Sequence, residues 1–403
     1  MKIAYLCFDF GIPVLGDKGA SVHVREMIAA LARAGHDVTL LCARTGSGNP
    51  APPGTTIEIT PRARASGDHN RPRDTERARI EFDADLPTRA EDALGRAEVE
   101  PDAIYERFSL FSRAGIALAA RRRIAHVLEV NAPLVDEQER YRNLQLKDEA
   151  LAHERATLMG TDHVIAISNE VAAYVAARGV SNERITVLPN GVDTTRFAPG
   201  RRGDGVRARH ELGHLPVIGF VGSLKAWHGI DLLLEAFPLI RARVPEAVLL
   251  IVGDGPEFAR LRTAVFELGQ EQNVIMTGRV PHDEVPAYLC AMDVSVAPYR
   301  PDDHFYFSPM KVVESLACGT PVVAPRLGQL EKLLHDGAIG MLYRAGDATA
   351  LAAAVIDLLS DRERLRLMGL AASTLTPTDH SWDANARDVV HLMRRARRAV
   401  TVS

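Results

Sequence analysis

The sequence predicts an α/β protein of two Rossmann-like domains that face each other across a cleft. The chain has 403 residues, which is enough for two domains of ordinary size. Short apolar runs alternate with amphipathic stretches of helical length, which is the order of parallel βαβ units. This order starts at Lys2 and again at Val217. The predicted domains are residues 1–195 and 196–380, with the boundary near Thr195 to His210.

The first domain opens with a complete βαβ unit. Lys2 to Phe8 is a short apolar run, a glycine-containing loop follows, and Val22 to Ala34 has a helical pattern that ends at Gly35. Val38 to Ala43 is the second apolar run, and it completes the unit. Further buried strands are expected at residues 103–105, 125–130, 164–167 and 185–188.

The segment 46–101 differs from its surroundings in composition. It is rich in Pro, Gly, Arg and Asp, and only residues 57–59 and 80–82 look strand-like. Long connections of this composition bury little apolar surface of their own. We therefore predict a mobile insertion in the first domain.

The second domain repeats the pattern of the first. A strand at residues 217–222 runs into a glycine-containing loop and then a helix at 230–240. A last helical stretch, residues 384–396, has no strand after it. We predict that this C-terminal segment, 381–403, crosses back to the first domain. Between these elements, strands are expected at 247–252, 274–277, 294–297 and 321–324, and helices at 257–268 and 309–318.

Composition argues against several classes of protein. Apolar residues make up 46% of the chain and charged residues 25%, the usual balance of a globular protein. The net charge is 48 − 52 = −4, which gives no positive field to attract nucleic acid. No apolar run reaches the ~18 residues that a membrane helix needs, and no signal-peptide pattern opens the chain, so we expect a cytoplasmic protein. The cysteines lack CxxC spacing and are expected to be packing residues rather than metal ligands: Cys7, Cys42, Cys290 and Cys318.

The strongest candidate site lies in residues 305–325. Ser308 is a favourable N-cap and Pro309 a favourable first helical residue, so free backbone N–H groups would bind an anion there. Lys311 then falls in the first turn, where the helix dipole disfavours a cation by about 0.3–1 kcal/mol unless a bound negative charge offsets it. Two interpretations stay open. Lys311 forms a surface pair with Glu314, or Lys311 binds a diphosphate while Glu314 accepts from two ribose hydroxyls.

A second candidate loop, residues 222–229, follows a strand and precedes a helix. Gly222 would let the backbone approach a ligand, and Lys225 and His228 would offer cationic donors. The alternatives are a surface histidine and, at Trp227, a packing side chain. Lysine is rare in this chain, and three of its lysines lie in loops where a compact ammonium suits phosphate: Lys18, Lys225 and Lys311.

Taken together, these motifs resemble the retaining, nucleotide-sugar-dependent glycosyltransferases of family 4, which have the GT-B fold. LPNGVDTTRF at residues 188–197 resembles the interdomain hinge of that family. Residues 219–237 resemble its first donor loop, and VGDGPE at 252–257 resembles the turn below that loop. The resemblance extends from Lys2 to about Asp383, apart from the segment 46–101.

Further segments fit the same family. Residues 278–289 resemble the segment whose backbone reads the nucleotide base, near Arg279 and Val280. Residues 13–24 resemble the acceptor-side glycine loop, although an ordinary turn is the alternative. The loop residues expected to face the acceptor and the leaving diphosphate are Gly16, Lys18 and Gly19.

The chain departs from the family's pattern in the segment that contacts the donor. The family commonly has two glutamates separated by seven residues; the second is Glu314, but Tyr306 occupies the first position. Either a neighbouring residue replaces that carboxylate, or the Tyr306 hydroxyl contacts the sugar. The neighbours that qualify are Asp302, Asp303 and His304, and the residues expected to line the donor here are Tyr306, Phe307, Ser308 and Pro309.

Two more departures concern the first donor loop and the first domain. Where the family commonly has Arg and Lys in the loop, this chain has Ser223 and His228, so Lys225 and Lys311 would replace those cations. Where a histidine often follows the fourth strand of the first domain, facing the sugar, the chain has LEVNAP. The residues that stand there on the acceptor side are Glu129 and Asn131.

The resemblance implies retaining transfer of a sugar from a nucleoside-diphosphate sugar to a hydroxyl acceptor, with no cofactor and no metal. Helix dipoles and ammonium groups would stabilise the leaving diphosphate, and its departing oxygen would take the acceptor's proton. The acceptor stays open among a glycan, a lipid-linked glycan and a small metabolite. The run Arg121, Arg122 and Arg123 suits either peripheral contact with anionic lipid at the inner membrane face or a solvated helix end.

Two other functions compete with this one. A non-catalytic sugar-nucleotide-binding protein is the first alternative, because Tyr306 replaces a family carboxylate. A nicotinamide-dependent oxidoreductase is the second, but no GxGxxG follows the first strand and no acidic residue ends the second. Measured turnover separates these alternatives.

Overall fold

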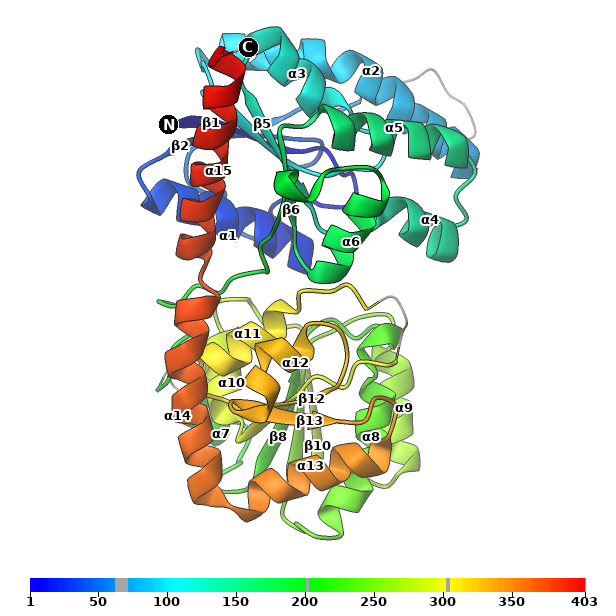
Figure 1. Cartoon of the computed structure of the whole chain (residues 1–403). Helices are drawn as coiled ribbons and strands as arrows, with labels where there is room; N and C mark the ends of the chain where they lie inside the picture. The colour runs from blue at the N-terminus through cyan, green and yellow to red at the C-terminus, as the bar shows by residue number, and fades with distance from the viewer. Residues whose placement is uncertain (62–71, 201–202, 302–304, 403) are drawn as a thin grey trace. The chain divides into compact units, whose positions relative to one another are not determined.

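The computed structural model describes residues 1–61, 72–200, 203–301 and 305–402, which form two compact units (Figure 1). Each unit has its own parallel sheet and its own apolar core, and each is considered by itself below. Unit 1 consists of residues 1–190, 306–308 and 382–403, and unit 2 of residues 191–305 and 309–381.

Unit 1 is built on a seven-stranded parallel sheet in the order β3-β2-β1-β4-β5-β6-β7. Its central strands are buried along nearly their whole length, as expected of a parallel sheet covered on both faces. The strands predicted in this domain are confirmed to within a few residues, except at 80–82. Their bounds are β1 Lys2–Cys7, β2 Asp37–Cys42, β3 Thr55–Glu58, β4 Ala103–Arg107, β5 Ala125–Val130, β6 His163–Ala166 and β7 Ile185–Val187.

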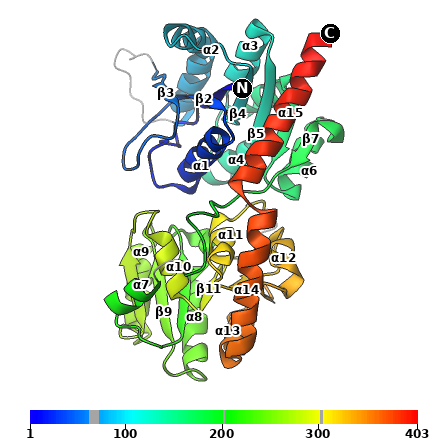
Figure 2. The ribbon, with the colours of Figure 1, turned by 90° about the vertical axis from the view of Figure 1, so that its left-hand side faces the viewer.

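The helices of unit 1 follow the strands in the expected alternation. The predicted helix at 22–34 is confirmed as α1, and Gly35 with φ 80° ends it. The C-terminal helix α15 packs against α1 and β5, which confirms its return to the first domain (Figure 2). The bounds are α1 Gly19–Arg33, α2 Pro72–Arg96, α3 Ala114–Arg122, α4 Leu134–Arg142, α5 Lys147–Gly160, α6 Asn169–Ala177 and α15 Trp382–Val402, with a 3₁₀ turn η1 at Asn182–Arg184.

The prediction of a strand at 80–82 is wrong, because these residues lie inside the 25-residue helix α2. Phe82, Leu86 and Ala90 recur at helical spacing, and all three are buried in the core between α2 and the sheet. Exposed charged residues such as Arg77, Glu81 and Asp92 give the segment its loop-like composition, whereas Asp83 is buried. Most of the segment 46–101 is therefore part of the folded unit, with β3 and α2 as its described elements.

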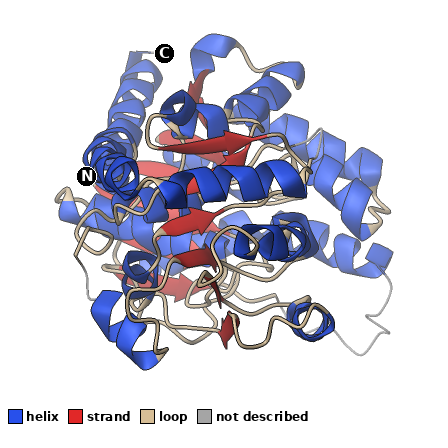
Figure 3. Cartoon of the chain, turned by 90° about the horizontal axis from the view of Figure 1, so that it is seen from below, coloured by secondary structure: helices blue, strands red, loops and turns tan. Residues whose placement is uncertain are grey.

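Unit 2 has a six-stranded parallel sheet in the order β10-β9-β8-β11-β12-β13, with helices on either side of the strands (Figure 3). The predicted strands are confirmed, and β13 is an addition that sequence reasoning missed. The strand bounds are β8 Val217–Val221, β9 Val248–Val252, β10 Val274–Gly278, β11 Val294–Val296, β12 Val322–Pro325 and β13 Gly340–Tyr343.

The core of unit 2 lies between this sheet and helices α8 and α13, which pack against each other. The predicted helices at 230–240, 257–268 and 309–318 are confirmed as α8, α9 and α11. The bounds are α7 Gly203–Arg209, α8 Ile230–Arg241, α9 Phe258–Glu267, α10 Val285–Ala291, α11 Met310–Ala317, α12 Leu330–Leu333, α13 Ala348–Ser360 and α14 Arg362–Asp379, with 3₁₀ turns η2 Ala226–His228 and η3 His335–Gly337.

The cysteines and the arginine run are used for packing and ion pairing. Cys7 and Cys42 are free, buried partners in the β1–β2 register, and burial raises the pKa of each thiol to about 12. Arg122 pairs with Glu91 at 2.9 Å and Glu100 at 2.6 Å within unit 1. In the part of the chain that the structure describes, no helix has the length and apolar content needed to span a membrane.

The burial of α2 predicts a large contribution to stability. Leu94 is fully buried in the core of unit 1, so Leu94→Ala should lower the free energy of unfolding by about 2–5 kcal/mol. Asp92→Ala, at an exposed position of the same helix, should change it by no more than about 0.5 kcal/mol. Urea denaturation followed by circular dichroism measures both. Equal, small effects would contradict a structural role for α2.

Candidate functional site

Lys311 is a buried lysine whose ammonium has no hydrogen-bond partner among the residues that the structure describes. It is the second residue of α11, and its Nζ atom is buried without a hydrogen-bond partner. The Nζ lies 4.3 Å from the centre of the Phe220 ring and 5.4 Å from that of Tyr299. Burial lowers the pKa of Lys311 to about 7, because the charged form loses its hydration. No described carboxylate bonds to this ammonium, so a nearby anion would stabilise its charged form.

Two glycines let the backbone pack closely around this ammonium. Gly222, directly after β8, has φ 143°, and a Cβ there would lie 2.7 Å from Lys311 Nζ. Gly253, directly after β9, has φ 139°, and its Cβ would lie 2.0 Å from the Gly222 carbonyl oxygen. Both loops follow the carboxyl ends of strands, where ligands bind in open α/β sheets. The backbone therefore packs tightly around the buried Nζ of Lys311.

The prediction that Ser308 caps α11 is wrong. The N-cap is Pro309, which makes no side-chain cap hydrogen bond, and the helix starts at Met310. The Ser308 hydroxyl instead accepts from the backbone N–H of Asn190 at 2.8 Å, within unit 1. Since no side chain caps α11, its first N–H groups are left for a ligand.

The surface pair between Lys311 and Glu314 is not formed. Glu314 is only 9% exposed, and its Oε1 lies 3.2 Å from Nε2 of His282. Lys311 and Glu314 attract each other electrostatically, but no hydrogen bond or ion pair joins them among the described residues. The alternative in which each contacts a ligand stays a prediction.

His228 is not the cationic donor that its position predicts. Its Nδ1 donates to the Ser223 carbonyl oxygen at 2.5 Å, so its Nε2 carries the lone pair. Burial, followed by the charge of Lys311, lowers the pKa of His228 to about 2. The ring is therefore a neutral acceptor beside Lys311. Lys225, by contrast, lies over the exposed Trp227, with its Nζ 4.6 Å from the ring centre.

The other predicted donor residues fall into two groups. Arg279 and Val280 follow β10 at the carboxyl edge of the unit 2 sheet, and Ser223 is exposed in the loop after β8. Tyr306 and Phe307 belong instead to unit 1, where Tyr306 is 8% exposed in an apolar cluster and Phe307 packs against that cluster. The possible substitutes for the missing carboxylate, Asp302, Asp303 and His304, lie outside the described residues.

Glu129 is the centre of a buried polar cluster in unit 1. Glu129 lies near the carboxyl end of β5, and its carboxylate accepts hydrogen bonds from the Tyr105 hydroxyl and the Asn131 amide. Its Oε1 lies 2.6 Å from His23 Nε2 and 3.5 Å from Arg107 Nη1. Burial alone would raise the pKa of Glu129, but these partners together lower it to about 2. Glu129 is thus an ionised carboxylate whose oxygens already contact protein partners.

Asn131, rather than Glu129, has capacity left for a ligand. Its amide nitrogen donates to Glu129, which leaves the carbonyl Oδ1 buried without a hydrogen-bond partner. A buried carbonyl acceptor without a donor costs free energy that a substrate hydroxyl would recover. The sequence predicted both residues on the acceptor side. In the structure, the Glu129 carboxylate is occupied by protein partners, whereas Asn131 Oδ1 has no hydrogen-bond partner among the described residues.

The predicted acceptor loop is an exposed turn before α1. Lys18 is the N-cap residue of α1, and its Nζ donates to the Gly11 carbonyl oxygen at 2.8 Å. Gly16 bonds through its N–H to the Pro13 carbonyl and through its carbonyl to Arg25, at 2.9 and 2.7 Å. Gly19 is the first residue of α1. Side chains such as Lys18, Arg25 and Asn49 therefore hold the loop by hydrogen bonds to its carbonyl groups.

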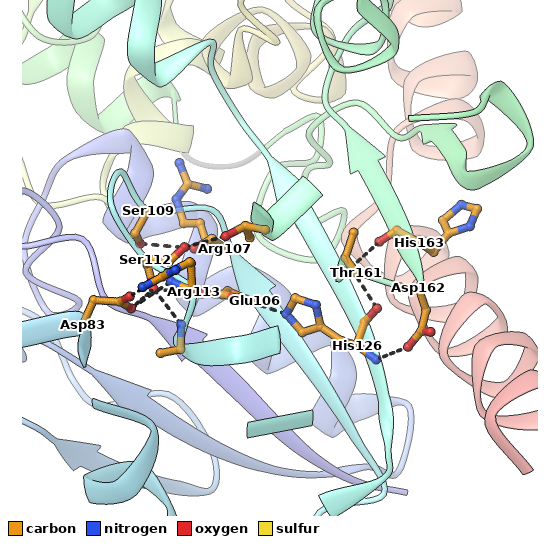
Figure 4. A network of polar contacts seen from close by, with 12 residues as sticks. Asp83, Glu106, Arg107, Ser109, Ser112, Arg113, His126, Thr161, Asp162 and His163 are labelled. Carbon is orange, nitrogen blue, oxygen red and sulfur yellow. Dashed lines mark hydrogen bonds and ion pairs between the residues drawn. The ribbon is translucent and has the colours of Figure 1, made fainter. Parts of the chain in front are cut away.

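A pocket in unit 1 opens beside this loop. It is formed by the loop after β1, by α2, by the loop after β4 and by α4. Asp83 at its wall accepts from the Arg113 N–H at 2.8 Å and from Ser112, which anchors the loop after β4 to α2 (Figure 4). The same figure shows Glu106 bound to His126 at 2.9 Å, both fully buried. The lining mixes apolar side chains with charged ones of both signs: Phe8, Phe10, Phe82 and Phe111, the arginines Arg79 and Arg142, and the carboxylates Asp9, Asp83 and Glu137.

Sequence reasoning missed four residues of these sites: His23, Arg107, Asn190 and His282. One of them carried a signal. His23 lies between the buried residues Val22 and Val24 on the inward side of α1, so a polar ring at a core position indicates a buried partner. The others have neighbours distant in sequence that no local pattern shows.

Each unit contains a segment that matches the model of a known protein family. Residues 18–196 match the model described as Glycosyltransferase Family 4, and residues 215–361 match the model described as Glycosyl transferases group 1. Together, these matches cover the sheets of both units except for β1 at the start of the chain.

Curated relatives and solved structures agree with these matches. A GDP-mannose-dependent α-(1-6)-phosphatidylinositol monomannoside mannosyltransferase of Mycolicibacterium smegmatis is 35% identical over 53% of this chain and 56% of its own length. A D-inositol 3-phosphate glycosyltransferase of Nocardia farcinica is 34% identical over 54% of this chain and 49% of its own. The matches thus span about half the length of these relatives.

Solved structures match over nearly the whole chain. A sucrose-phosphate synthase from Thermosynechococcus elongatus superposes with a TM-score of 0.76 at 23% identity, covering 98% of each chain. The Anabaena protein HepE in complex with UDP and glucose gives 0.72 at 19% identity, over 98% of this chain and 100% of its own. These likenesses show the GT-B fold. The chain belongs to the family 4 glycosyltransferases.

Proposed function

We propose that the chain is a retaining glycosyltransferase that transfers a sugar from a nucleoside-diphosphate sugar to a hydroxyl of an acceptor. The observation that carries this proposal is the buried, unpartnered ammonium of Lys311 beside Gly222 and the uncapped start of α11. A diphosphate supplies the charge that this ammonium lacks and accepts from the free N–H groups. Relatives named as GDP-mannose-dependent, and a structural neighbour bound to UDP, support a nucleoside-diphosphate donor.

In this proposal each residue of unit 2 has a defined part. Lys311 and the N–H groups of α11 stabilise the negative charge that grows on the leaving diphosphate. Glu314, one turn further along α11, accepts from the two ribose hydroxyls. The backbone at Arg279 and Val280 contacts the base, and the neutral Nε2 of His228 accepts from the donor. Because Lys311 provides the positive charge, the proposed reaction needs no metal ion.

The acceptor is proposed to bind in unit 1. Asn131 Oδ1, buried without a partner, accepts from an acceptor hydroxyl. The phenylalanines of the pocket contact an apolar face of the acceptor, and its carboxylates accept from acceptor hydroxyls. Arg79 and Arg142 suit an anionic substituent. Relatives named for phosphatidylinositol and inositol phosphate support an acceptor of this kind. In the retaining reaction, the departing diphosphate oxygen takes the proton of the attacking hydroxyl.

Donor turnover tests the proposal directly. The protein is incubated with UDP-, GDP-, ADP- and dTDP-sugars, with and without inositol phosphate or a phosphatidylinositol vesicle, and the nucleoside diphosphate released is measured. We expect one donor to be consumed, and proton NMR of the fresh product to show the anomeric configuration of the donor. Binding without turnover of any donor would favour a non-catalytic sugar-nucleotide-binding protein, and an inverted product would exclude retention.

Lys311→Met should separate function from stability. Removal of the ammonium should reduce donor turnover at least 100-fold, because the leaving diphosphate loses about 3 kcal/mol of charge stabilisation. The ligand-free protein should unfold at the same temperature or higher, since a buried unpaired charge is removed. Single-turnover rates and thermal melts measure the two effects. Lys332→Met, at an exposed site in α12, is the control and should change neither. An active but destabilised Lys311→Met protein would remove Lys311 from the site.

Nucleoside-diphosphate binding should take up a proton. The pKa of Lys311 is about 7 without ligand, so much of the ammonium is neutral at pH 8. A bound diphosphate favours the charged form, so affinity should fall as pH rises above 7, by at most about tenfold per pH unit. Calorimetry at pH 8 in buffers of different ionisation enthalpy measures the uptake, and the uptake should vanish in Lys311→Met. Uptake that is unchanged in that variant would assign the proton to another group.

A further inference from the structure

Unit 1 holds two of the points where the chain passes to unit 2. Asn190 is the last residue of unit 1 before unit 2 begins at Gly191, and Ser308 is the last before unit 2 resumes at Pro309. Asn190 donates from its backbone N–H to Ser308 Oγ at 2.8 Å and from its side-chain Nδ2 to the Ser308 carbonyl at 2.7 Å. Both residues are buried. The two chain passages are therefore tied to each other by a pair of hydrogen bonds.

This pair fixes which way the Asn190 amide faces. A carbonyl oxygen only accepts, so the atom that contacts the Ser308 carbonyl is the NH₂ group. The opposite atom, Oδ1, lies 2.8 Å from Nδ1 of His23. Since Oδ1 is also an acceptor, His23 Nδ1 carries a proton and donates it.

The second nitrogen of His23 is protonated for an independent reason. Nε2 lies 2.6 Å from Glu129 Oε1, and two atoms that both presented lone pairs would repel at that distance. Glu129 already accepts from Tyr105 and Asn131 and faces Arg107, so it is ionised and the proton resides on the ring. The contact is an ion pair rather than a well-directed hydrogen bond. His23 is only 4% exposed, and its ring packs edge-on against Trp382, with the ring centres 4.9 Å apart.

We infer that His23 is a positioning residue, held as a buried imidazolium by Glu129, that fixes the Asn190–Ser308 junction from which helix α11 starts. Ser308 precedes Lys311 by three residues, and Pro309 between them has no N–H and forms no side-chain cap. The hydrogen bonds from Asn190 therefore hold the chain immediately before the helix. The benefit of holding it rests on the proposed function, in which the start of α11 binds the donor diphosphate.

The protonation state is testable without any substrate. In protein labelled with ¹⁵N-histidine, long-range proton–nitrogen NMR at pH 8 should show two protonated nitrogens for His23, assigned by the signal lost in His23→Gln. In Glu129→Gln the carboxylate is gone, and His23 should change to the neutral form with one protonated nitrogen. A singly protonated His23 in the native protein at pH 8 would overturn the inference.

The positioning role has its own readouts. The backbone amide signals of Met310 and Lys311 should shift in His23→Gln and in Asn190→Asp, which cannot donate to the Ser308 carbonyl. They should stay in place in His163→Gln, a control for a buried histidine of unit 1 that bonds to Thr186. With the donor found above, kcat should fall at least tenfold in the first two variants, whereas the Kd of the nucleoside diphosphate should change less than threefold.

The outcomes distinguish this inference from the proposed function. Unmoved Met310 and Lys311 signals in both variants would overturn the positioning role, even with His23 doubly protonated. A lower melting temperature with unchanged amide signals and unchanged kcat would mark His23 as merely structural, and would overturn it as well. If no donor is turned over by the native protein, the proposed function fails while the NMR signals still decide the role of His23.

Discussion

Burial of charge, compensated in one unit and left uncompensated in the other, is the constraint on which the rest of this structure depends. In unit 1, Glu129 is surrounded by partners, and its low pKa of about 2 records that they outweigh the cost of burial. In unit 2, Lys311 is buried among aromatic rings with no hydrogen-bond partner among the described residues, and its pKa falls to about 7. The first arrangement is complete without a ligand. In the proposed function the second is completed by the diphosphate of the donor, and the free energy recovered then contributes to binding.

The loops around Lys311 are shaped by the same requirement. A small anionic group must reach Nζ without water filling the site, so the backbone has to come close where side chains would obstruct it. Gly222 and Gly253 meet this need, since a Cβ at either position would collide with Lys311 or with the neighbouring carbonyl. His228 adds to it in a different way. Its neutral ring avoids a second positive charge beside Lys311, which two adjacent buried cations could not both retain.

The sequence contains the information for most of the fold but for less of the site. Buried parallel strands are continuous apolar runs, so the strands were predictable at nearly every position. Helix α2 was not, because its charged outer face dominates the composition and hides the spacing of Phe82, Leu86 and Ala90. Lys311 was predictable from the helix dipole, a local effect. His23 and Asn190 were not singled out, because their contacts join residues 167 positions apart. The Ser308 cap was predicted wrongly for the same reason, since a distant N–H bonds to its hydroxyl.

The departure at Tyr306 acquires a physical meaning from its surroundings. The family's pattern has a carboxylate at this position, whereas here the side chain is buried in an apolar cluster of unit 1 with residues such as Phe108 and Leu128. A glutamate among these side chains would bury a charge at a cost of several kcal/mol or become protonated. The tyrosine therefore suits the apolar cluster in which it is buried. Replacing Tyr306 with glutamate, without changing the apolar residues around it, would not recreate the family's carboxylate site. In the proposed function, recognition of the donor sugar relies on groups other than a carboxylate at this position. The uncapped start of α11 and the lone pair of His228 are two such polar groups among the described residues of unit 2.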